Sequence, residues 1–321
     1  MRYSFVLWPH SNGRYEEAMR LPVQNELSLI LSHTGVNAAV EGREVFGVYT
    51  LCFETDAPVK AEALCAHSHS FWVCEERNGA FVPLCGENVP AVGRDLPFVL
   101  KYKGKTNERF TRMLINLAIC ASDFSFGDRL TILDPMCGKG TTLFEALNRG
   151  WDACGCDLDK KSLQEAREYF KKYLEFHRIK HTCSSDSRTL PGGSAKSDVF
   201  ALGKDGPKLQ LACCDGSLCD RVFSKNRANI IACDLPYGVQ HAPGNRKGFE
   251  ETLDEMMESW KRALLPGGGM ALSFNTFTLH RDRVRDIMRN HGFTVMEGGA
   301  WDGFAHWVEQ AVNRDTAVCR R

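Results

Sequence analysis

A short apolar run that ends in an aspartate recurs four times between residues 130 and 234, and this repetition constrains the fold more than any other feature of the sequence. The four runs end at Asp134, Asp157, Asp215 and Asp234. Each has the length of a strand, and segments with helical spacing of apolar residues lie between them. Alternating strands and helices predict a doubly wound, mostly parallel sheet whose strand ends face one rim. The sequence therefore predicts an α/β, Rossmann-like fold with carboxylates along the rim where ligands bind.

The first strand end leads into a glycine-rich turn. Asp134 is followed by Pro-Met-Cys-Gly-Lys-Gly-Thr-Thr and then by a helical pattern. Gly138 and Gly140 let the backbone approach a ligand closely, and the N-terminus of the helix offers free N–H groups to a phosphate or a carboxylate. The spacing matches neither a Walker loop nor the Gly-x-Gly-x-x-Gly dinucleotide motif. The candidate cofactor-binding residues of this segment are Asp134, Met136, Gly138, Gly140 and Thr141.

Two later strand ends extend the expected cofactor site. Asp157 follows Gly140 by roughly 17 residues, close to the spacing at which a strand-end acid binds ribose hydroxyls in doubly wound folds. Asp159 better suits the alternative role of helix N-cap. Asp215 can accept a hydrogen bond from an adenine amino group, although Asp-Gly alone is also an ordinary turn. The residues assigned to this part of the site are Asp157, Leu158, Asp215 and Gly216.

The fourth strand end is the candidate catalytic turn, Asp234-Leu235-Pro236-Tyr237. An exocyclic amino group on a flat ring can donate hydrogen bonds to the Asp234 carboxylate and the Leu235 carbonyl. Pro236 fixes one backbone angle, and the ring of Tyr237 can stack on the heterocycle. Four such residues also occur by chance as a plain turn. The catalytic interpretation depends on position, because this turn shares its rim with the other three carboxylates.

A basic connector precedes the first strand of this sheet. Lys101, Lys103 and Lys105 alternate along it, so their side chains point the same way if the segment is extended. With Thr106 they form a candidate edge for contacts with substrate phosphates, while the alternative is a solvated linker. Lys+Arg and Asp+Glu are equal at 40 each, so the chain as a whole has no net field that would attract nucleic acid or a membrane. Any basic surface must be local.

The pattern of the chain changes near residue 98. Residues 1–98 are expected to form a small α/β domain that binds substrate or packs against the rest, with one helix spanning Val59 to about His69. Residues 99–321 contain the four strand ends, and residues 181–208 within them are expected to form an exposed insertion. A solvated face is expected for the arginines of a later helix, Arg281, Arg283, Arg285 and Arg289.

The 14 cysteines are scattered and include no Cys-x-x-Cys pair. The apolar N-terminal stretch is too short for a signal peptide, so we expect reduced thiols in a cytoplasmic protein that contacts no membrane. The cluster of Cys65, His67 and His69, with Cys74 and Cys85 nearby, does not have the spacing of a common zinc module. We therefore expect no metal.

The segment from Lys101 to Arg321 resembles a class I S-adenosylmethionine-dependent methyltransferase of the kind that modifies amino groups. Residues 134–141, Asp-Pro-Met-Cys-Gly-Lys-Gly-Thr, are similar to the cofactor loop of that family, and residues 234–237 are similar to its Asp/Asn-Pro-Pro-Tyr catalytic motif. Leu235 stands where the motif has its first proline. This replacement leaves the carbonyl available and is expected to loosen its orientation.

Within that family the chain looks most like the RNA guanine-N2 methyltransferases, which include the tRNA guanosine-10 enzymes and their THUMP-bearing relatives. The segments that carry this likeness are 103–107, 140–147 and 314–318, with the opening strand and the Asn25-Glu26-Leu27 helix. The first hundred residues are too short to hold a full THUMP domain beside that opening part.

The resemblance implies that S-adenosylmethionine is the cofactor and that a methyl group passes to an exocyclic amino nitrogen of a nucleobase, first of all guanine N2 in tRNA. It implies that Asp157 holds the ribose, Asp215 the adenine and Asp234 the reacting amine. RNA is the expected partner, with a paired base flipped out and the connector lysines on phosphates. Two alternatives stay open, a DNA adenine-N6 or cytosine-N4 methyltransferase and a non-catalytic RNA-binding scaffold. The sequence does not indicate an oligomeric state.

Overall fold

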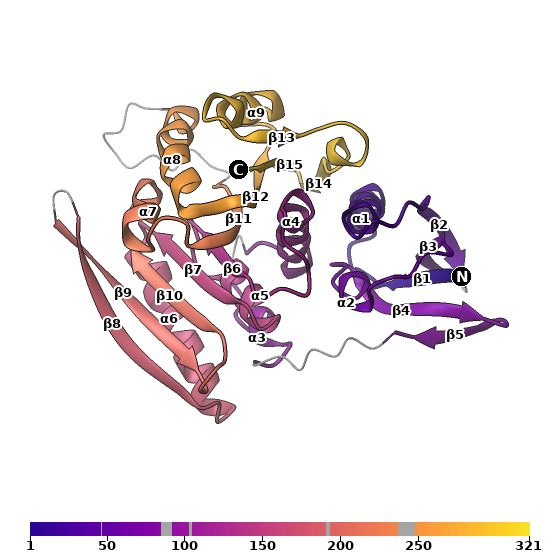
Figure 1. Cartoon of the computed structure of the whole chain (residues 1–321), viewed down its shortest axis with the longest axis horizontal. Coiled ribbons are helices and arrows are strands. Elements are labelled where there is room, and N and C mark those ends of the chain that lie inside the picture. Colours follow the sequence, from indigo (N-terminus) through magenta and orange to yellow (C-terminus); the bar gives the residue numbers. More distant parts are fainter. Residues whose placement is uncertain (46, 85–91, 103–104, 191–192, 237–247) are drawn as a thin grey trace.

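The computed structural model describes residues 1–45, 47–84, 92–102, 105–190, 193–236 and 248–321. Its described strands form two sheets, a small one near the N-terminus and a large one that carries the strand-end acids. Helices α1 (Gly13–His33) and α4 (Glu108–Ala121) pack against each other between the two sheets (Figure 1). One hydrophobic core therefore runs from the small sheet through these helices into the large sheet.

The small sheet is antiparallel throughout, with the order β2-β3-β1-β4-β5. Its strands are β1 (Arg2–Leu7), β2 (Glu41–Val45), β3 (Val48–Glu54), β4 (Ser70–Arg77) and β5 (Ala80–Pro83). Helix α1 begins after Asn12, whose side-chain oxygen accepts hydrogen bonds from the backbone N–H groups of Arg14 and Tyr15. Its apolar face, which includes Leu27 and Ile30, is buried.

The helix expected from Val59 to about His69 is much shorter in the structure. Helix α2 covers only Ala61–Leu64. The chain leaves the helix because the residues that follow have tertiary partners. Ser68 donates to the buried carboxylate of Glu26 through its backbone N–H at 3.0 Å and through its hydroxyl at 2.5 Å. These bonds to a buried charge are stronger than the local preference for another helical turn.

The large sheet has the strand order β13-β15-β12-β11-β6-β7-β10-β9-β8, with β14 paired to β15. Its strands are β6 (Thr131–Asp134), β7 (Asp152–Asp157), β8 (His181–Leu190), β9 (Gly193–Leu202), β10 (Lys208–Cys213), β11 (Ala228–Asp234), β12 (Leu264–Asn275), β13 (Thr294–Met296), β14 (His306–Glu309) and β15 (Val312–Arg320). The five central strands β10, β7, β6, β11 and β12 are parallel. The chain starts the sheet at β6, adds β7 and β10 on one side of it, and adds β11 and β12 on the other side. The predicted doubly wound, Rossmann-like fold is confirmed.

Helices cover both faces of the large sheet (Figure 1). Besides α4 they are α3 (Leu96–Val99), α5 (Thr141–Asn148), α6 (Lys160–Phe176), α7 (Cys219–Val222), α8 (Phe249–Ala263) and α9 (Arg281–Asn290), with 3₁₀ turns at Gly216–Leu218 and Gly299–Asp302. Alternate residues of β11 point to opposite faces of the large sheet. Ile230 and Ala232 join the core that contains α4, whereas Ile231 and Cys233 join a second core with Trp260 of α8. This explains why the strand is a continuous apolar run.

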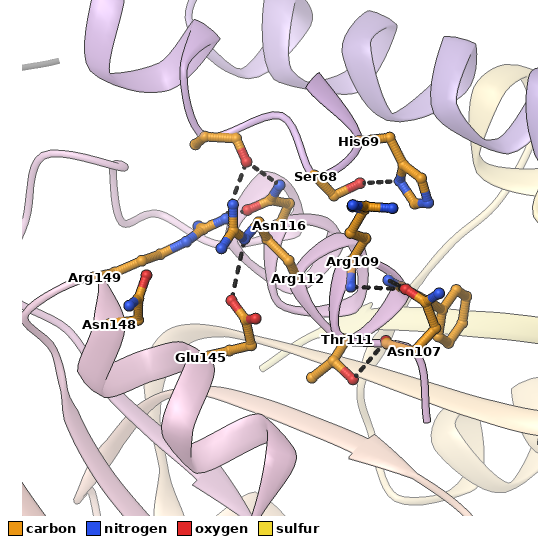
Figure 2. Close-up of polar contacts among 12 residues, drawn as sticks. Ser68, His69, Asn107, Arg109, Thr111, Arg112, Asn116, Glu145, Asn148 and Arg149 are labelled. Atoms are coloured by element: carbon orange, nitrogen blue, oxygen red, sulfur yellow. Dashed lines mark hydrogen bonds and ion pairs between the residues drawn. The ribbon is translucent and has the colours of Figure 1, made fainter. Parts of the chain in front are cut away.

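A buried polar network also joins the two sheets. Asn116 of α4 donates to Glu26 of α1 at 2.5 Å, and Arg149 donates to the Asn116 side-chain oxygen at 2.7 Å. Arg112 of α4 forms an ion pair with fully buried Glu145 of α5 at 3.1 Å (Figure 2). Breaking a buried, hydrogen-bonded pair leaves a charge without compensation. The network therefore holds the small sheet in one position on α4 and α5.

The segment 181–208 is exposed along most of β8, as expected, but it is not an insertion outside the sheet. Strands β8 and β9 pair with each other, and β9 pairs with β10, so the segment extends the large sheet (Figure 1). Strand β9 alternates buried Ala195 and Ser197 with exposed neighbours and ends in buried Phe200 and Leu202. Ladder hydrogen bonds compensate for the polar composition of β8, whose residues are mostly exposed.

The expected solvated arginine face of α9 is wrong for two of its four members. Two guanidinium nitrogens of Arg281 engage Asp315, at 2.6 and 2.7 Å. Arg285 is buried and pairs with Asp302. These pairs hold α9 against β15 and the turn before β14. Across the part of the chain that the structure describes, no helix is both long and apolar enough to cross a bilayer.

Candidate active site

A cavity of about 490 Å³ lies at the carboxyl ends of the central strands. Strand β6 supplies Asp134, strand β11 supplies Asp234, and the connector before α4 forms a third wall. The predicted site residues that line it are Thr106, Asp134, Met136, Gly138, Thr141, Asp234, Leu235 and Pro236. The structure thus brings the candidate cofactor turn and the candidate catalytic turn to one cavity, although about a hundred residues separate them in the sequence.

The glycine-rich turn is shaped by two left-handed residues. Gly138 has φ of +50° and Gly140 has φ of +86°, a region that other residues rarely adopt. The backbone N–H of Gly138 donates to Asp157 at 2.8 Å, and the N–H of Asp159 donates to the other oxygen of Asp157 at 2.8 Å. Asp157 therefore links the end of β7 to the turn after β6. Asp159 caps α6 by accepting from the N–H of Lys161, as the sequence predicted.

Asp134 is the most deeply buried acid of the cavity, with 3% of its surface exposed. Its carboxyl accepts a hydrogen bond from the N–H of Met136 at 3.0 Å. Burial raises the pKa of Asp134 to about 7, because an ionised carboxylate loses hydration that its few hydrogen bonds do not replace. A bound cation at this position would favour the ionised form.

Asp234 is held from three directions. Ser273 of β12 donates to one carboxylate oxygen at 2.6 Å, and the Thr106 hydroxyl donates to the other. The guanidinium of buried Arg314, on β15, lies 3.9 Å from that second oxygen. The carboxylate is therefore fixed in place at the rim of the cavity.

Two contacts restrain the turn at Leu235, the residue that stands where the family motif has its first proline. The N–H of Leu235, which a proline would lack, donates to the carbonyl of Ser273 at 2.9 Å. The side chain of Leu235 is buried in the core beneath the cavity. A hydrogen bond and packing thus restrain the backbone where a proline ring would otherwise do so.

Several predicted residues do not line the cavity. Leu158 is 66% exposed beside Asp157, and Asp215 caps the turn that begins at Gly216 by accepting from the N–H of Ser217. Gly216 is buried against Trp260, whose indole N–H donates to its carbonyl at 3.0 Å. Gly140, in the turn after β6, and Asp157, at the end of β7, do not line the cavity either.

The three connector lysines do not form one exposed edge. Lys105 turns inward, donates to the carbonyl of Pro97 at 2.5 Å and pairs with Glu108. Its side chain is only 10% exposed, so it has no free charge for a phosphate. Lys101 is exposed. Lys103 lies outside the described residues, and so does Tyr237 of the candidate catalytic turn.

The cavity also contains residues that sequence reasoning missed. Tyr102 lines it, with its hydroxyl 3.2 Å from that of Thr141 and the Lys139 ammonium 4.7 Å from its ring centre. Burial raises the pKa of Tyr102, so it stays protonated. Of the three residues that contact Asp234, Ser273 and Arg314 were missed as well. Ser273 interrupts an apolar strand, which was a detectable signal, whereas Arg314 lies in the segment 314–318 that resembles the family but was given no role. The remaining additional lining residues are Thr111, Cys137, Thr142 and Ser162.

Comparisons with known proteins show the family of the chain. A family model described as the RMKL-like methyltransferase domain matches residues 101–298. A tRNA (guanine(10)-N2)-dimethyltransferase of Methanothermobacter thermautotrophicus is 24% identical over 172 residues, which are 54% of this chain and 39% of that protein. The chain thus matches well under half the length of this relative.

Two solved structures are similar to the chain at low identity. TrmN from Thermus thermophilus has a TM-score of 0.44 and 16% identity over 88% of this chain and 60% of its own. The rRNA methyltransferase aviRa from Streptomyces viridochromogenes has a TM-score of 0.42 and 14% identity over 72% of this chain and 91% of its own.

Proposed function

Since the chain belongs to the RMKL-like methyltransferase family, we propose that it transfers the methyl group of S-adenosylmethionine to an exocyclic amino nitrogen of a nucleobase in RNA, with guanine N2 of tRNA as the first candidate. The observation that carries this proposal is the carboxylate of Asp234, fixed by Ser273 and Thr106 on the rim of the cavity that also contains Asp134. The choice of tRNA rests on the similarity to the tRNA (guanine(10)-N2)-dimethyltransferase of Methanothermobacter thermautotrophicus and on the resemblance of the connector.

The residues around the cavity fit S-adenosylmethionine, which supplies an electrophilic methyl group when bound. Asp134 offers a carboxyl group to the amine of the methionine end. A Cβ at Gly138 would meet no atom within 4 Å, so the turn leaves open space beside its backbone. Asp157 would hold the ribose, and exposed Leu158 offers an apolar surface for the adenine. Asp215 lies in the next turn of the rim and would accept from the adenine amine.

The catalytic problem for these side chains is the weak nucleophilicity of an aromatic amine, whose lone pair is conjugated with the ring. Hydrogen bonds from the NH₂ group to Asp234 and to the Leu235 carbonyl would hold the nitrogen in a pyramidal geometry and point its lone pair at the methyl group. Pro236 stiffens the turn. Because Ser273 and Thr106 position Asp234 before substrate arrives, little reorganisation is needed at the moment of transfer.

Methyl transfer from labelled S-adenosylmethionine to separate pools of tRNA, rRNA and DNA tests the proposal. We expect label in tRNA, recovered as N2-methylguanosine after digestion, and a loss of at least about a hundredfold in Asp234→Ala. Asp186→Ala, an exposed acid on β8, is the matched control and should retain full activity. Label in DNA would instead support the DNA methyltransferase alternative. Binding of RNA without transfer to any pool would support the scaffold, and full activity in Asp234→Ala would remove Asp234 from catalysis.

Calorimetry tests the cofactor assignment separately from the substrate. Asp157→Ala should bind S-adenosylmethionine markedly more weakly, because it loses both ribose contacts and the hydrogen bond that ties the turn at Gly138. Asp157→Asn keeps an oxygen for that backbone bond and should lose less. Affinity that is unchanged in both variants would exclude Asp157 from the ribose site.

A further inference from the structure

A second, smaller cavity of about 120 Å³ lies where the small sheet meets the start of α4. Its walls include Trp8, Tyr15, Tyr49, His69, Asn107 and Arg109. Asn107 is the N-cap of α4 and directly follows Thr106, whose hydroxyl contacts Asp234. The cavity therefore lies next to the candidate catalytic turn and apart from the cofactor cavity.

His69 is one of the residues that line this cavity, and one of its ring nitrogens is a buried hydrogen-bond acceptor. The Ser68 hydroxyl has a single proton, which it donates to Glu26 at 2.5 Å, so Nδ1 of His69 must donate to that hydroxyl across 2.7 Å (Figure 2). Burial and neighbouring cations lower the pKa of His69 well below its usual value, which keeps the ring neutral. Nε2 then carries a lone pair, and it has no partner among the described residues.

Tyr15 lines the same cavity and is also incompletely paired. Only 6% of its surface is exposed, and its hydroxyl has no hydrogen-bond partner in the described part of the chain. A buried hydroxyl or imidazole nitrogen without a partner is unfavourable, and Tyr15 and His69 both line this cavity, so a polar occupant that pairs with these atoms would be stabilised there. The hydroxyl can donate or accept, and Nε2 of His69 can only accept. The occupant must therefore bring at least one N–H or O–H donor.

An exposed aromatic surface adjoins this cavity. Trp8, Phe71 and Trp72 are 42%, 48% and 54% exposed. The Trp8 and Phe71 ring centres are 4.3 Å apart, and Phe71 and Trp72 stack with an interplanar angle of 6°. The guanidinium of Arg109 lies 4.8 Å from the Trp8 ring centre, and no described carboxylate pairs with it. Three contiguous exposed aromatics beside an available arginine are typical of surfaces that stack unpaired bases.

The geometry points to a binding site for an unpaired nucleotide of the RNA substrate, with its base donating to His69 in the small cavity and a neighbouring base stacked within the exposed aromatic surface of Trp8, Phe71 and Trp72. Arg109 would contact the phosphate between them. This inference rests on the proposed RNA substrate and adds a second contact region on the small sheet. It explains why Trp8, Phe71 and Trp72 stay exposed although apolar surface is usually buried.

Fluorescence anisotropy with fluorescein-labelled, single-stranded RNA pentamers of A, C or U tests the site without methyl transfer. Trp8→Ala and Phe71→Ala should each weaken pentamer binding by roughly 5- to 100-fold, the range seen for single stacking contacts. Tyr15→Phe should weaken it by about 2- to 10-fold while thermal stability stays equal or rises, because the removed hydroxyl has no protein partner among the described residues. Phe176→Ala, an aromatic on α6 that is 82% exposed, is the control and should bind as the unchanged protein does.

The inference is overturned if the pentamers do not bind the unchanged protein, or if they bind all four variants equally. The occupant of the cavity would then be ordered water or a protein partner. Kinetics separate this failure from failure of the proposed function. If tRNA is methylated and the KM for tRNA is the same in Trp8→Ala and Phe176→Ala, the second site falls and the function stands. If no RNA is methylated but pentamer binding drops in Trp8→Ala, the site stands and the function falls.

Discussion

Replacing Asp134 by asparagine should change how the stability of the protein depends on pH. The folded state raises the pKa of this carboxyl from 3.8 to about 7, mainly through burial. Between about pH 4 and pH 7 the folded state therefore keeps a proton that the unfolded state has released. The free energy of unfolding consequently falls as pH rises through this window, by up to 1.4 kcal/mol per pH unit from this group alone.

The size of the effect follows from the shift. About three pKa units correspond to about 4 kcal/mol of stability, which is fully present below pH 4 and fully lost above pH 7. The asparagine of the variant cannot ionise, and it keeps an oxygen for the N–H of Met136. The free energy of unfolding of Asp134→Asn, minus that of the unchanged protein, should therefore increase by about 4 kcal/mol between pH 4 and pH 8.

Urea unfolding at pH 4, 5, 6, 7 and 8, at constant ionic strength and without cofactor, measures this difference. Asp159→Asn is the control. The pKa of that exposed carboxyl is lowered by the hydroxyl of Ser162, so its contribution is complete above about pH 4 and the difference for this variant should be flat across the window. A flat difference for Asp134→Asn as well would refute the conclusion that burial keeps Asp134 protonated.

Two further predictions concern packing and catalysis. Gly269→Ala should destabilise the protein by about 3 kcal/mol or more in thermal or urea unfolding, because its Cβ would overlap the carbonyl oxygen of Ala118 where α4 packs on β12. Gly13→Ala is the control and should be nearly neutral, because its Cβ would meet no atom within 4 Å. Equal stability of the two variants would contradict this close contact. Ser273→Ala should lower kcat for methyl transfer by roughly 10- to 100-fold, because Asp234 would lose its position, while the Kd for S-adenosylmethionine stays constant. A loss confined to cofactor affinity would exclude a role of Ser273 in positioning Asp234.

Local patterns predicted the central strands and the caps because their causes lie within a few residues. The apolar run of β11 predicted both the strand and its end at Asp234, and the two glycines predicted a turn after β6, where they have φ of +50° and +86°. Asp159 as N-cap of α6 follows from the same kind of local hydrogen bond. Such features depend on backbone geometry and on the periodicity of apolar residues, and both are visible in a short window of sequence.

The wrong predictions concern segments whose secondary structure or exposure depends on partners elsewhere in the chain. Strand β8 is too polar to look like a strand, yet β9 supplies its hydrogen bonds. Lys105 looks like part of an exposed run but is drawn inward by Glu108 and the carbonyl of Pro97. Arg285 lies on a charged helix but is buried by its pairing with Asp302. In each case an interaction with another element outweighs the preference that composition expresses.

The sequence by itself determined that this chain builds a doubly wound sheet with acids at its strand ends and a cofactor turn after the first of them. Only the tertiary structure decided how those acids are used. It placed Ser273, Thr106 and Arg314 around Asp234, and it brought Tyr15, His69 and Arg109 together beside the catalytic turn. The periodicity of apolar residues and the chemistry of turns are local properties. The hydrogen-bond partners of a carboxylate and the walls of a cavity come from segments far apart in the chain.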